Sequence, residues 1–460
     1  MTDQRTVHPS FRRGLALAAL FVLIVGVVFY GRHVSRTGWE EVKNNPRAND
    51  FASYFYAVKV AADGDSPYET QKLKKKASLD ERRGTVYPFF YPPPYLISMA
   101  WALPLELHVS HKVFFWAGSL FLVSVLMALW RWVANPAMVA MSGLVLMSFT
   151  PIHDTLRMGQ ANLLVLALLV WGVLLAEWEG GNRRRWWGGG LVGLACMMKM
   201  SPALIVMWWM VRREWRPVLG AIGAAVLSSI LVLPLVGISH QWAFYTEVLP
   251  GFTSGSYHDL SVPINIPMNH SMLNFWMQVE SGFEGMRKAS EASLLASNLA
   301  RASSLGLLVG LFFLFRRVRP DALSRSNAAG AFVVLMVLVP AYAYEHHFVF
   351  LLFPLLAVAA AFGQGRLHWH WLFFFLPIYA ILAWDLTDFK AISMNLGDGS
   401  LWSPPAVLFR ELKFAAALGL GVLCTLAALS ERNLEPAEVE ESPDSKPLVK
   451  HVRPLWEDGL

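Results

Sequence analysis

Apolar runs recur along the whole chain and leave little room for a soluble fold. Hydrophobic residues make up 55% of the 460 residues and charged residues only 16%, too few to cover a soluble globule of this size. The runs span residues 15–30, 96–105, 113–133, 138–149, 163–176, 187–198, 203–211, 218–238, 303–315, 328–344, 348–362, 371–384 and 406–429. A straight helix needs about 20 apolar residues to cross a bilayer, so several runs are too short to cross alone. The sequence therefore predicts an all-α polytopic membrane protein, a bundle of about 10 to 13 transmembrane or re-entrant helices.

Arginine-rich connections between these runs predict how the helices are oriented. Clusters of arginine occur within residues 5–13, 183–185, 212–213 and 316–319, and short loops rich in arginine stay on the cytoplasmic side of a membrane. The first apolar run follows one such cluster and offers no small-residue cleavage site, so it indicates a retained anchor and not a signal peptide. All four clusters should lie in the cytoplasm.

The same orientation assigns the remaining segments. Residues 31–93 and 239–301 become the first and second large extracytoplasmic loops, and residues 431–460, rich in Glu and Pro, become a disordered cytoplasmic tail. We expect residues 1–430 to form one multi-pass domain in the cell (inner or plasma) membrane. The lysine-rich stretch 72–76 in the first outer loop opposes this scheme, but long loops follow the charge rule weakly.

The net charge and the two cysteines limit which partners and which kinds of site the chain can have. The formal net charge is +6, and because membrane loops account for much of this excess, we expect the lipid bilayer as partner and no nucleic acid. Cys196 and Cys424 both lie inside apolar runs, which indicates neither a disulfide framework nor a cysteine metal site. No cofactor is predicted, and the sequence leaves a metal requirement open.

Asp50 in the first outer loop is the candidate base, since a carboxylate held at a lipid boundary can accept a proton. The spacing of Phe51, Tyr54, Phe55 and Val58 puts these side chains on one face of a helix. We expect this face to lie along the interface and to anchor the loop to lipid. An ordinary aromatic membrane belt with solvated acids is the alternative interpretation.

Three polar side chains precede the run at residues 163–176. Arg157, Gln160 and Asn162 could donate hydrogen bonds to a sugar hydroxyl or a phosphate oxygen. Helix capping by Asn162 and solvation at the interface are the competing interpretation.

Lys199 gives a sharper signal, because a lysine inside an apolar run is costly unless it is paired or faces water. Extension of its side chain to the interface is the alternative. The pair His346 and His347 lies between two runs and can bind metal or neutralise phosphate, while Glu345 could instead hold one of these histidines. Since a lone histidine pair is weak evidence for metal, we predict no metal site.

Several of these residues belong to motifs that occur in the same order in one enzyme family. The motifs are Asn49-Asp50-Phe51 with Tyr54, GDSPY at 64–68, YPPP at 91–94, MGQANL at 158–163, KMSP at 199–202, NHSM at 269–272 and the histidine pair at 346–347. Over roughly residues 10–430 the sequence resembles glycosyltransferase family 87, the polyprenol-phosphate-mannose-dependent alpha-1,2-mannosyltransferase-like proteins of bacteria.

The resemblance implies a GT-C membrane fold, an extracytoplasmic active site, a polyprenyl-phosphate sugar donor and a catalytic aspartate, which Asp50 matches. It also implies that His346 and His347 lie near the donor phosphate. We count Tyr54 and Asn269 of the matching motifs among the substrate contacts.

The chemistry of such a transfer fits these residue types. One base must take the acceptor hydroxyl proton, and Asp50 could do so while the phosphodiester leaves. The departing phosphate needs positive charge, which Lys199, Arg157 and a protonated histidine of the pair could provide. We therefore expect a hexosyltransferase that moves mannose, with inversion, from a polyprenyl-phosphate donor to a lipid-linked or cell-envelope glycan acceptor.

Two other classes stay open. A transporter or lipid flippase would use Lys199, Glu345 and Asp385 as an ion pathway, although inverted repeats are not apparent and the acids gather at the ends of runs. An O-antigen ligase or polymerase type enzyme would transfer an oligosaccharide. Two departures from the family pattern, the stretch 72–76 and His270 where glutamine is more usual, leave the acceptor open. The sequence settles neither sugar, linkage, oligomeric state nor the number and parity of the early spans.

Overall fold

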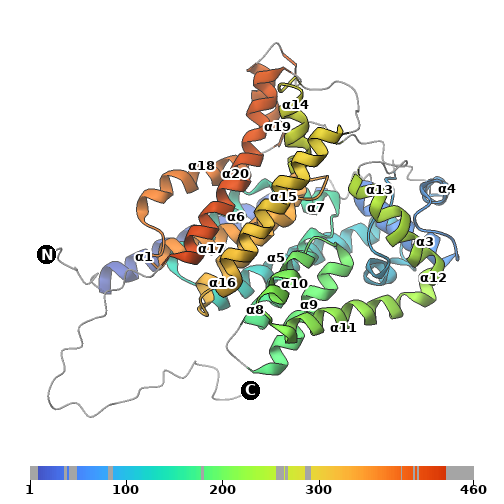
Figure 1. Cartoon of the computed structure of the whole chain (residues 1–460), viewed down its shortest axis with the longest axis horizontal. Helices are drawn as coiled ribbons and strands as arrows, with labels where there is room; N and C mark the ends of the chain where they lie inside the picture. The colour runs from blue at the N-terminus through green and yellow to red at the C-terminus, as the bar shows by residue number, and fades with distance from the viewer. Residues whose placement is uncertain are drawn as a thin grey trace.

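The computed structural model of the protein describes residues 9–430 apart from 36–38, 41–48, 81–85, 178–180, 255–263, 265–267, 285–291, 385, 397–398 and 401–402. The predicted tail 431–460 and parts of the predicted loops 31–93 and 239–301 lie outside these residues. In chain order the elements are α1 Pro9–His33, α3 Asn49–Ala62, α4 Thr70–Ser78, η2 Pro93–Ala102, α5 Leu107–Val133, α6 Pro136–Ser148, α7 Thr150–Met158, α8 Asn162–Glu177, α9 Asn182–Met198, α10 Ala203–Val211, α11 Trp215–Leu231, α12 Leu233–Ala243, η3 Phe244–Val248, α13 Leu249–Ser254, α14 Met272–Glu280, α15 Leu294–Leu314, η4 Phe315–Arg317, α16 Ala322–Leu338, η5 Glu345–Leu351, α17 Leu352–Gly363, η6 Trp369–Trp371, α18 Leu372–Ala383, α19 Leu386–Asn395 and α20 Pro404–Leu429. The described part of the chain contains helices and no strand, which confirms the all-α prediction (Figure 1).

The helices include long, bent and short apolar segments, as expected of a multi-pass membrane protein. Among the described residues, five segments are long and apolar enough to cross a membrane: Arg13–His33, Leu107–Val133, Leu294–Arg317, Glu345–Gly363 and Pro404–Leu429. Two bent pairs raise the number to seven, α6 with α7 at 52° and α11 with the following segment at 110°. Three shorter apolar helices, Asn162–Glu177, Ala322–Leu338 and Trp369–Ala383, join them. Fewer helices than expected can therefore cross alone, and the short and bent ones account for the remainder of the predicted set.

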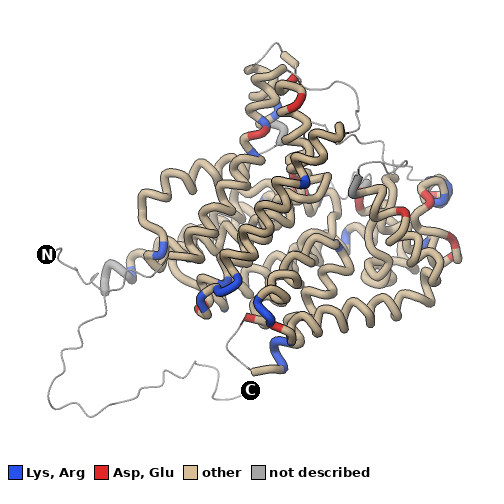
Figure 2. The backbone as a smooth tube through the Cα atoms, viewed as in Figure 1, with Lys and Arg blue, Asp and Glu red and all other residues tan. Residues whose placement is uncertain are grey.

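Arginine-rich ends of several helices meet around one buried carboxylate. Glu177 at the end of α8 pairs with Arg212 at 2.6 Å and with Arg325 at 3.2 Å, and its side chain also accepts from Trp209 Nε1 at 2.8 Å. Figure 2 shows the basic residues of this region gathered at the lower ends of the helices. The structure thus places basic connections of α8–α9, α10–α11 and α15–α16 on one side of the molecule, as the charge pattern predicted.

The aromatic face of α3 is covered by protein. Phe51, Tyr54, Phe55 and Val58 are each at most 1% exposed, and their cluster packs with the segment around Tyr91 and Tyr95. The prediction that this face anchors the loop to lipid is therefore wrong, and so is the membrane-belt alternative. The periodicity identified the apolar face correctly, but a second protein layer covers it.

The prolines and apolar residues that follow build this second layer. The run at 96–105 forms η2, a ten-residue 3-10 helix whose Tyr95, Leu96 and Met99 are fully buried. This run is consequently not a membrane span, because ten residues are too few to cross and one side of the helix packs in the protein core, while Ile97 and Trp101 are exposed.

A glycine turn sets the position of the next segment. Gly159 ends α7 in the left-handed conformation, with φ of 66°, which favours glycine because it has no Cβ. A Cβ added here would also lie 2.6 Å from Cβ of Phe51. The turn between α7 and α8, which carries Gln160, can therefore approach the start of α3, which carries Asp50.

Candidate active site

A cavity of about 730 Å³ collects most of the residues that the sequence singled out. Its lining includes Asp50 from α3, Arg157 from α7, Gln160 from the α7–α8 turn, Lys199 from the α9–α10 turn, and His346 and His347 from η5. These residues are far apart in the sequence, and the fold brings them together around this cavity. The predicted residues Tyr54, Asn162 and Asn269 do not line this cavity.

Asp50 faces the cavity from the first turn of α3. Its carboxylate accepts a hydrogen bond from the Gln160 side chain and interacts with the positive charge of Lys199. Burial nevertheless raises the pKa of Asp50 to about 6, because loss of hydration outweighs these two contacts. The group is ionised at neutral pH and accepts a proton more readily than an exposed aspartate would, as a general base requires.

Two phenols fix the orientation of Gln160. Its Oε1 lies 2.9 Å from the Tyr54 hydroxyl and 3.1 Å from the Tyr91 hydroxyl, and the two hydroxyls are 2.7 Å apart. Because the phenols donate to this oxygen, the amide nitrogen is left to donate to Asp50. Tyr54, predicted as a substrate contact, is fully buried and acts in this structure on Asp50 through Gln160.

Lys199 is held at the cavity by Asn162. Lys199 Nζ donates to Asn162 Oδ1 at 2.9 Å, and Asn162 Nδ2 donates to the backbone oxygen of His346 at 2.9 Å. Asn162 is 1% exposed, so both ends of its amide are used inside the protein. Asn162 thus links Lys199 to the turn that carries His346. We expect such a contact for a lysine that belongs to a site and not for one that extends to the interface.

The histidine pair is fixed by its backbone and by one ring nitrogen. Thr155 Oγ1 donates to the backbone oxygen of His346 at 3.0 Å. The backbone N–H of Tyr344 donates to His347 Nδ1 at 3.1 Å. Both imidazole rings line the cavity, with ring centroids 4.4 Å apart.

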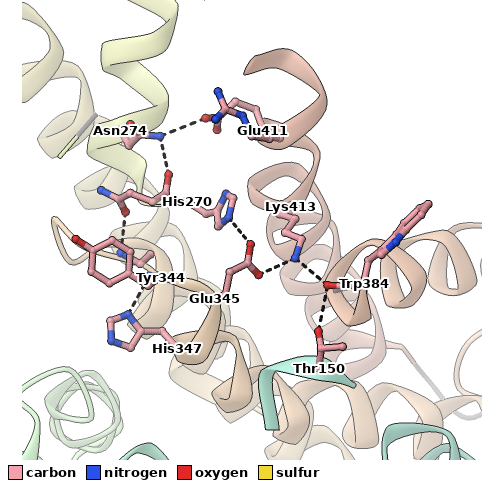
Figure 3. A network of polar contacts seen from close by, with 12 residues as sticks. Thr150, His270, Asn274, Tyr344, Glu345, His347, Trp384, Glu411 and Lys413 are labelled. Carbon is pink, nitrogen blue, oxygen red and sulfur yellow. Dashed lines mark hydrogen bonds and ion pairs between the residues drawn. The ribbon is translucent and has the colours of Figure 1, made fainter. Parts of the chain in front are cut away.

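Glu345 holds a different histidine from the one expected. Its carboxylate oxygens pair with His270 Nε2 at 2.9 Å and with Lys413 Nζ at 2.6 Å (Figure 3), and Lys413 also donates to the backbone oxygen of Trp384 at 3.1 Å. The alternative in which Glu345 orients His346 or His347 is therefore wrong. This network ties η5 to α20 at the edge of the cavity, whose lining includes Glu345.

Arg157 and Asn269 have contrasting surroundings. Arg157 lines the cavity, and its guanidinium donates to Asp154 at 3.3 Å. Asn269 is fully buried; it donates to the backbone of residues 264 and 341 and accepts from the backbone N–H groups of residues 271 and 343. Asn269 acts here as a brace between two loops.

The remainder of the lining divides into two kinds of wall. Leu335, Met336 and Val337 from α16 and Leu204 from α10 make an aliphatic wall. Tyrosines 87, 91, 342 and 344 with phenylalanines 90 and 252 make an aromatic wall. The sequence indicated Tyr91 only as part of the YPPP motif at 91–94 and did not single out Tyr344, whose only signal was its place beside the Glu345 to His347 motif.

No group of three His, Cys, Asp or Glu side chains suited to a metal ion occurs within the described ranges. The polar lining instead combines Asp50, whose pKa is raised, with two basic side chains, two imidazoles and two carboxylates that are already ion-paired, Asp154 and Glu345. Such a set can take a proton at one point and stabilise an anion at another.

Comparisons with known proteins place this arrangement in a family. A search of the curated proteins finds no match. Among solved structures, ArnT from Cupriavidus metallidurans, crystallised with undecaprenyl phosphate, matches at 14% identity and a TM-score of 0.40, covering 89% of this chain and 76% of that chain. The model of glycosyltransferase family 87 matches residues 89–340. Since this match spans more than half of the chain and includes Arg157, Gln160 and Lys199, the protein belongs to glycosyltransferase family 87.

Proposed function

We propose that the protein transfers mannose from a polyprenyl-phosphate donor to a lipid-linked or cell-envelope glycan acceptor, with Asp50 as the general base. The observation that carries the proposal is the meeting of Asp50 with Lys199, Arg157 and the histidine pair around one cavity. A base and cationic groups are the two requirements of a transfer from a phosphate-linked sugar. Lys199 and Arg157 are the cationic groups here, because His347 accepts a backbone N–H at Nδ1 and is therefore neutral.

The reaction divides between these groups. Asp50 removes the proton from an acceptor hydroxyl as its oxygen attacks the anomeric carbon of the donor sugar. The bond from that carbon to the phosphate oxygen breaks, and polyprenyl phosphate leaves with the electron pair. Attack opposite the leaving group inverts the configuration, so no second carboxylate is needed as nucleophile.

Lys199 and Arg157 are suited to the leaving phosphate. Both side chains line the cavity, and the contact from Lys199 to Asn162 leaves its other ammonium protons to donate. His347 accepts a backbone N–H at Nδ1, and its ring also hydrogen-bonds to the backbone of Tyr342. We therefore place the histidines beside the phosphate and assign its positive partners to Lys199 and Arg157. Positive charges that are already in position before the reaction stabilise the leaving phosphate without any rearrangement of the protein.

The aliphatic wall suits the polyprenyl chain. It is formed by the end of α16 and the start of α10, which are apolar helices of a membrane protein. Because the isoprenoid chain comes from bilayer hydrocarbon and not from water, contact with this wall would position the chain by packing and not by a hydrophobic driving force.

The fold also supports an extracytoplasmic site. Helix α8 runs from Asn162, beside the cavity, to Glu177 in the arginine cluster, and α16 runs from Arg325 in that cluster to Leu335 at the cavity. The cavity and the arginine cluster therefore lie at opposite ends of the same helices. If the arginines face the cytoplasm, the cavity opens on the outer side.

Purified protein supplied with polyprenyl-phosphate mannose and a cell-envelope glycan extract tests the proposal. We expect consumption of the donor that depends on the acceptor, and a product of opposite anomeric configuration by NMR. Intact donor together with transfer of a polyprenyl-linked oligosaccharide would instead support the ligase or polymerase class.

A further inference from the structure

A continuous row of aromatic rings forms one wall of the cavity. Ring centroids are 4.7 Å apart for Phe90 and Phe252, 5.1 Å for Phe252 and Tyr342, and 5.8 Å for Tyr342 and Tyr344. Tyr344 in turn stacks on His347 at 6.0 Å. All five residues line the cavity, so the row leads from the histidine pair to Phe90 and Phe252.

This row comes from different parts of the chain than the aliphatic wall. Phe90 belongs to the segment before η2, Phe252 to α13, and the two tyrosines to the loop between α16 and η5. The aliphatic side chains belong to α16 and α10 themselves. The cavity therefore presents a loop-built aromatic side and a helix-built aliphatic side to whatever it holds.

Tyr344 adds a polar atom that the protein leaves unused. Its hydroxyl is buried and has no hydrogen-bond partner within the described part of the chain. Figure 3 shows the Tyr344 hydroxyl pointing away from the Glu345 and Lys413 network. Tyr344 and Asp50 line the same cavity, so one ligand in it can reach both the phenol and the proposed base. A buried donor without a partner costs about 1 to 3 kcal/mol, a cost that a ligand hydroxyl would remove.

A sugar ring matches both features of this wall. The C–H faces of a pyranose are apolar and can cover an aromatic ring, while its hydroxyls project from the rim and can accept the Tyr344 proton. An isoprenoid chain has no hydroxyl and would leave Tyr344 unpaired. The aromatic wall therefore suits carbohydrate, and the aliphatic wall suits the lipid.

We propose that Phe90, Phe252, Tyr342 and Tyr344 form the acceptor subsite, in which a pyranose ring of the acceptor glycan lies against the aromatic wall. Tyr344 donates to one ring hydroxyl, and a neighbouring hydroxyl faces Asp50. This assignment rests on the proposed transferase function and specifies the chemical class of its acceptor.

Saturation-transfer NMR on the full chain in detergent micelles tests the subsite without requiring turnover. The probe is methyl α-D-mannopyranoside, and the aromatic protons of the protein are saturated. We expect transfer to the ring C–H protons, about three- to tenfold weaker probe binding in Tyr344→Phe, which removes one hydrogen bond, and a larger loss in Phe252→Leu. Tyr379→Phe, which removes a buried hydroxyl that contacts Ser148 outside the cavity, should match the unmodified protein.

Two further measurements test the acceptor subsite independently of the proposed reaction. Asp50→Asn should retain the sugar signal even though it abolishes transfer, so a failure of the base assignment leaves the subsite testable. In the inactive Asp50→Asn variant, polyprenyl-phosphate mannose should not displace the mannoside, since the donor chain lies on the aliphatic wall and the donor sugar lies outside the acceptor subsite. Displacement by this donor, absence of transfer to the mannoside, or equal signals in Tyr344→Phe, Phe252→Leu and the unmodified protein would overturn the acceptor subsite.

Discussion

The two ends of α8 and α16 hold charged groups in opposite ways. At one end, Glu177 is closed in by Arg212 and Arg325, and its side chain is 1% exposed. At the other end, Asp50 and Lys199 line an open cavity, and their direct hydrogen-bond contacts include the neutral amides of Gln160 and Asn162.

The difference separates a structural cluster from a reactive one. A buried charge that is fully paired holds helices together and has no capacity left for a ligand. A charge held by a neutral amide keeps most of its field, so it can act on a substrate. Charge pairing, more than charge alone, therefore distinguishes Asp50 and Lys199 at the cavity from Glu177 at the arginine end.

The largest expected effect is on the reactive end. Asp50→Asn keeps the shape and removes the proton acceptor, so transfer should fall on the order of 100-fold or more. Donor binding should persist, because Asp50 is not assigned to the phosphate. Initial rates and donor titrations measure the two effects separately.

Asp63 and Asp65 are the matched controls for this variant. They lie on the same loop, are more than half exposed, and pair with Lys76 and Lys72. Since exposed ion pairs contribute about 0 to 1 kcal/mol, their Asn variants should transfer normally. Retention of more than about a third of turnover in Asp50→Asn, together with loss in either control, would move the base to another carboxylate.

Glu177→Gln probes the structural end and should act on stability. Removing one partner of a buried charge cluster costs about 3 to 5 kcal/mol, so thermal unfolding in detergent should shift clearly downward. The folded fraction should keep its affinity for the donor. An unfolding temperature equal to that of the unmodified protein would show that the cluster contributes little to the fold.

Lys199→Met should have the opposite effect to Glu177→Gln: it should lower activity and leave stability unchanged. If the ammonium neutralises the donor phosphate, donor use should weaken by more than about tenfold, or 1.4 kcal/mol, while the protein still inserts and folds. Turnover against donor concentration and thermal unfolding provide the two readouts. Unchanged turnover would remove Lys199 from the phosphate site.

Replacement of Tyr54 and Tyr91, the tyrosine pair that contacts Gln160, should change the pH dependence of transfer more than its maximal rate. Transfer needs ionised Asp50, whose pKa is about 6, so the rate should rise with pH through that value. Loss of both phenols in Tyr54→Phe/Tyr91→Phe frees the Gln160 amide to turn, which weakens its hydrogen bond to Asp50 and raises that pKa. The acid limb should then move to higher pH. Burial lowers the pKa of Lys199 to about 7, so loss of its charge sets a separate alkaline limb that the variant and the unmodified protein share.

Tyr68→Phe is the control for the tyrosine pair. Its hydroxyl donates to a backbone oxygen and does not contact Gln160, so the acid limb should stay in place. An acid limb that moves equally in Tyr68→Phe, or not at all in the double variant, would argue against the Gln160 orientation.

Cysteine labelling tests which end faces which side of the membrane, with no intended change in activity. Leu79 is 78% exposed on the first outer loop, and Arg184 is exposed at the start of α9, while both native cysteines are buried. A cysteine at 79 should react with an impermeant reagent from outside, and one at 184 only from the cytoplasm. Reaction of both from one side would contradict the orientation.

The sequence predicted the cavity residues better than their neighbours. Lys199 was singled out because charge in apolar sequence is costly, Asp50 as a carboxylate at a lipid boundary, and the histidine pair for its metal or phosphate chemistry. The fold brings all of them to one cavity. Asn162 has an equally suggestive sequence position, but its amide is used inside the protein. Which partner an amide finds depends on tertiary contacts that spacing does not encode.

The same limit applies to burial. A period of 3.6 residues identified the aromatic face of α3 but could not distinguish lipid from protein as its cover, and Phe51 proved to pack on protein. Tyr91 and Tyr344 were missed because tyrosines are common at membrane boundaries. Their roles depend on single hydroxyl contacts, which only the fold defines.

The lengths of α8 and α16 make bilayer thickness relevant to the site. With 16 and 17 residues at 1.5 Å each, they reach about 24 and 26 Å, less than the roughly 30 Å of a typical hydrocarbon core. Because one end of each carries the arginine cluster, the cavity end lies below the opposite headgroup plane unless the lipid layer thins around it. A donor lipid would therefore meet Lys199 at a depth set jointly by the protein and by the acyl chains around it.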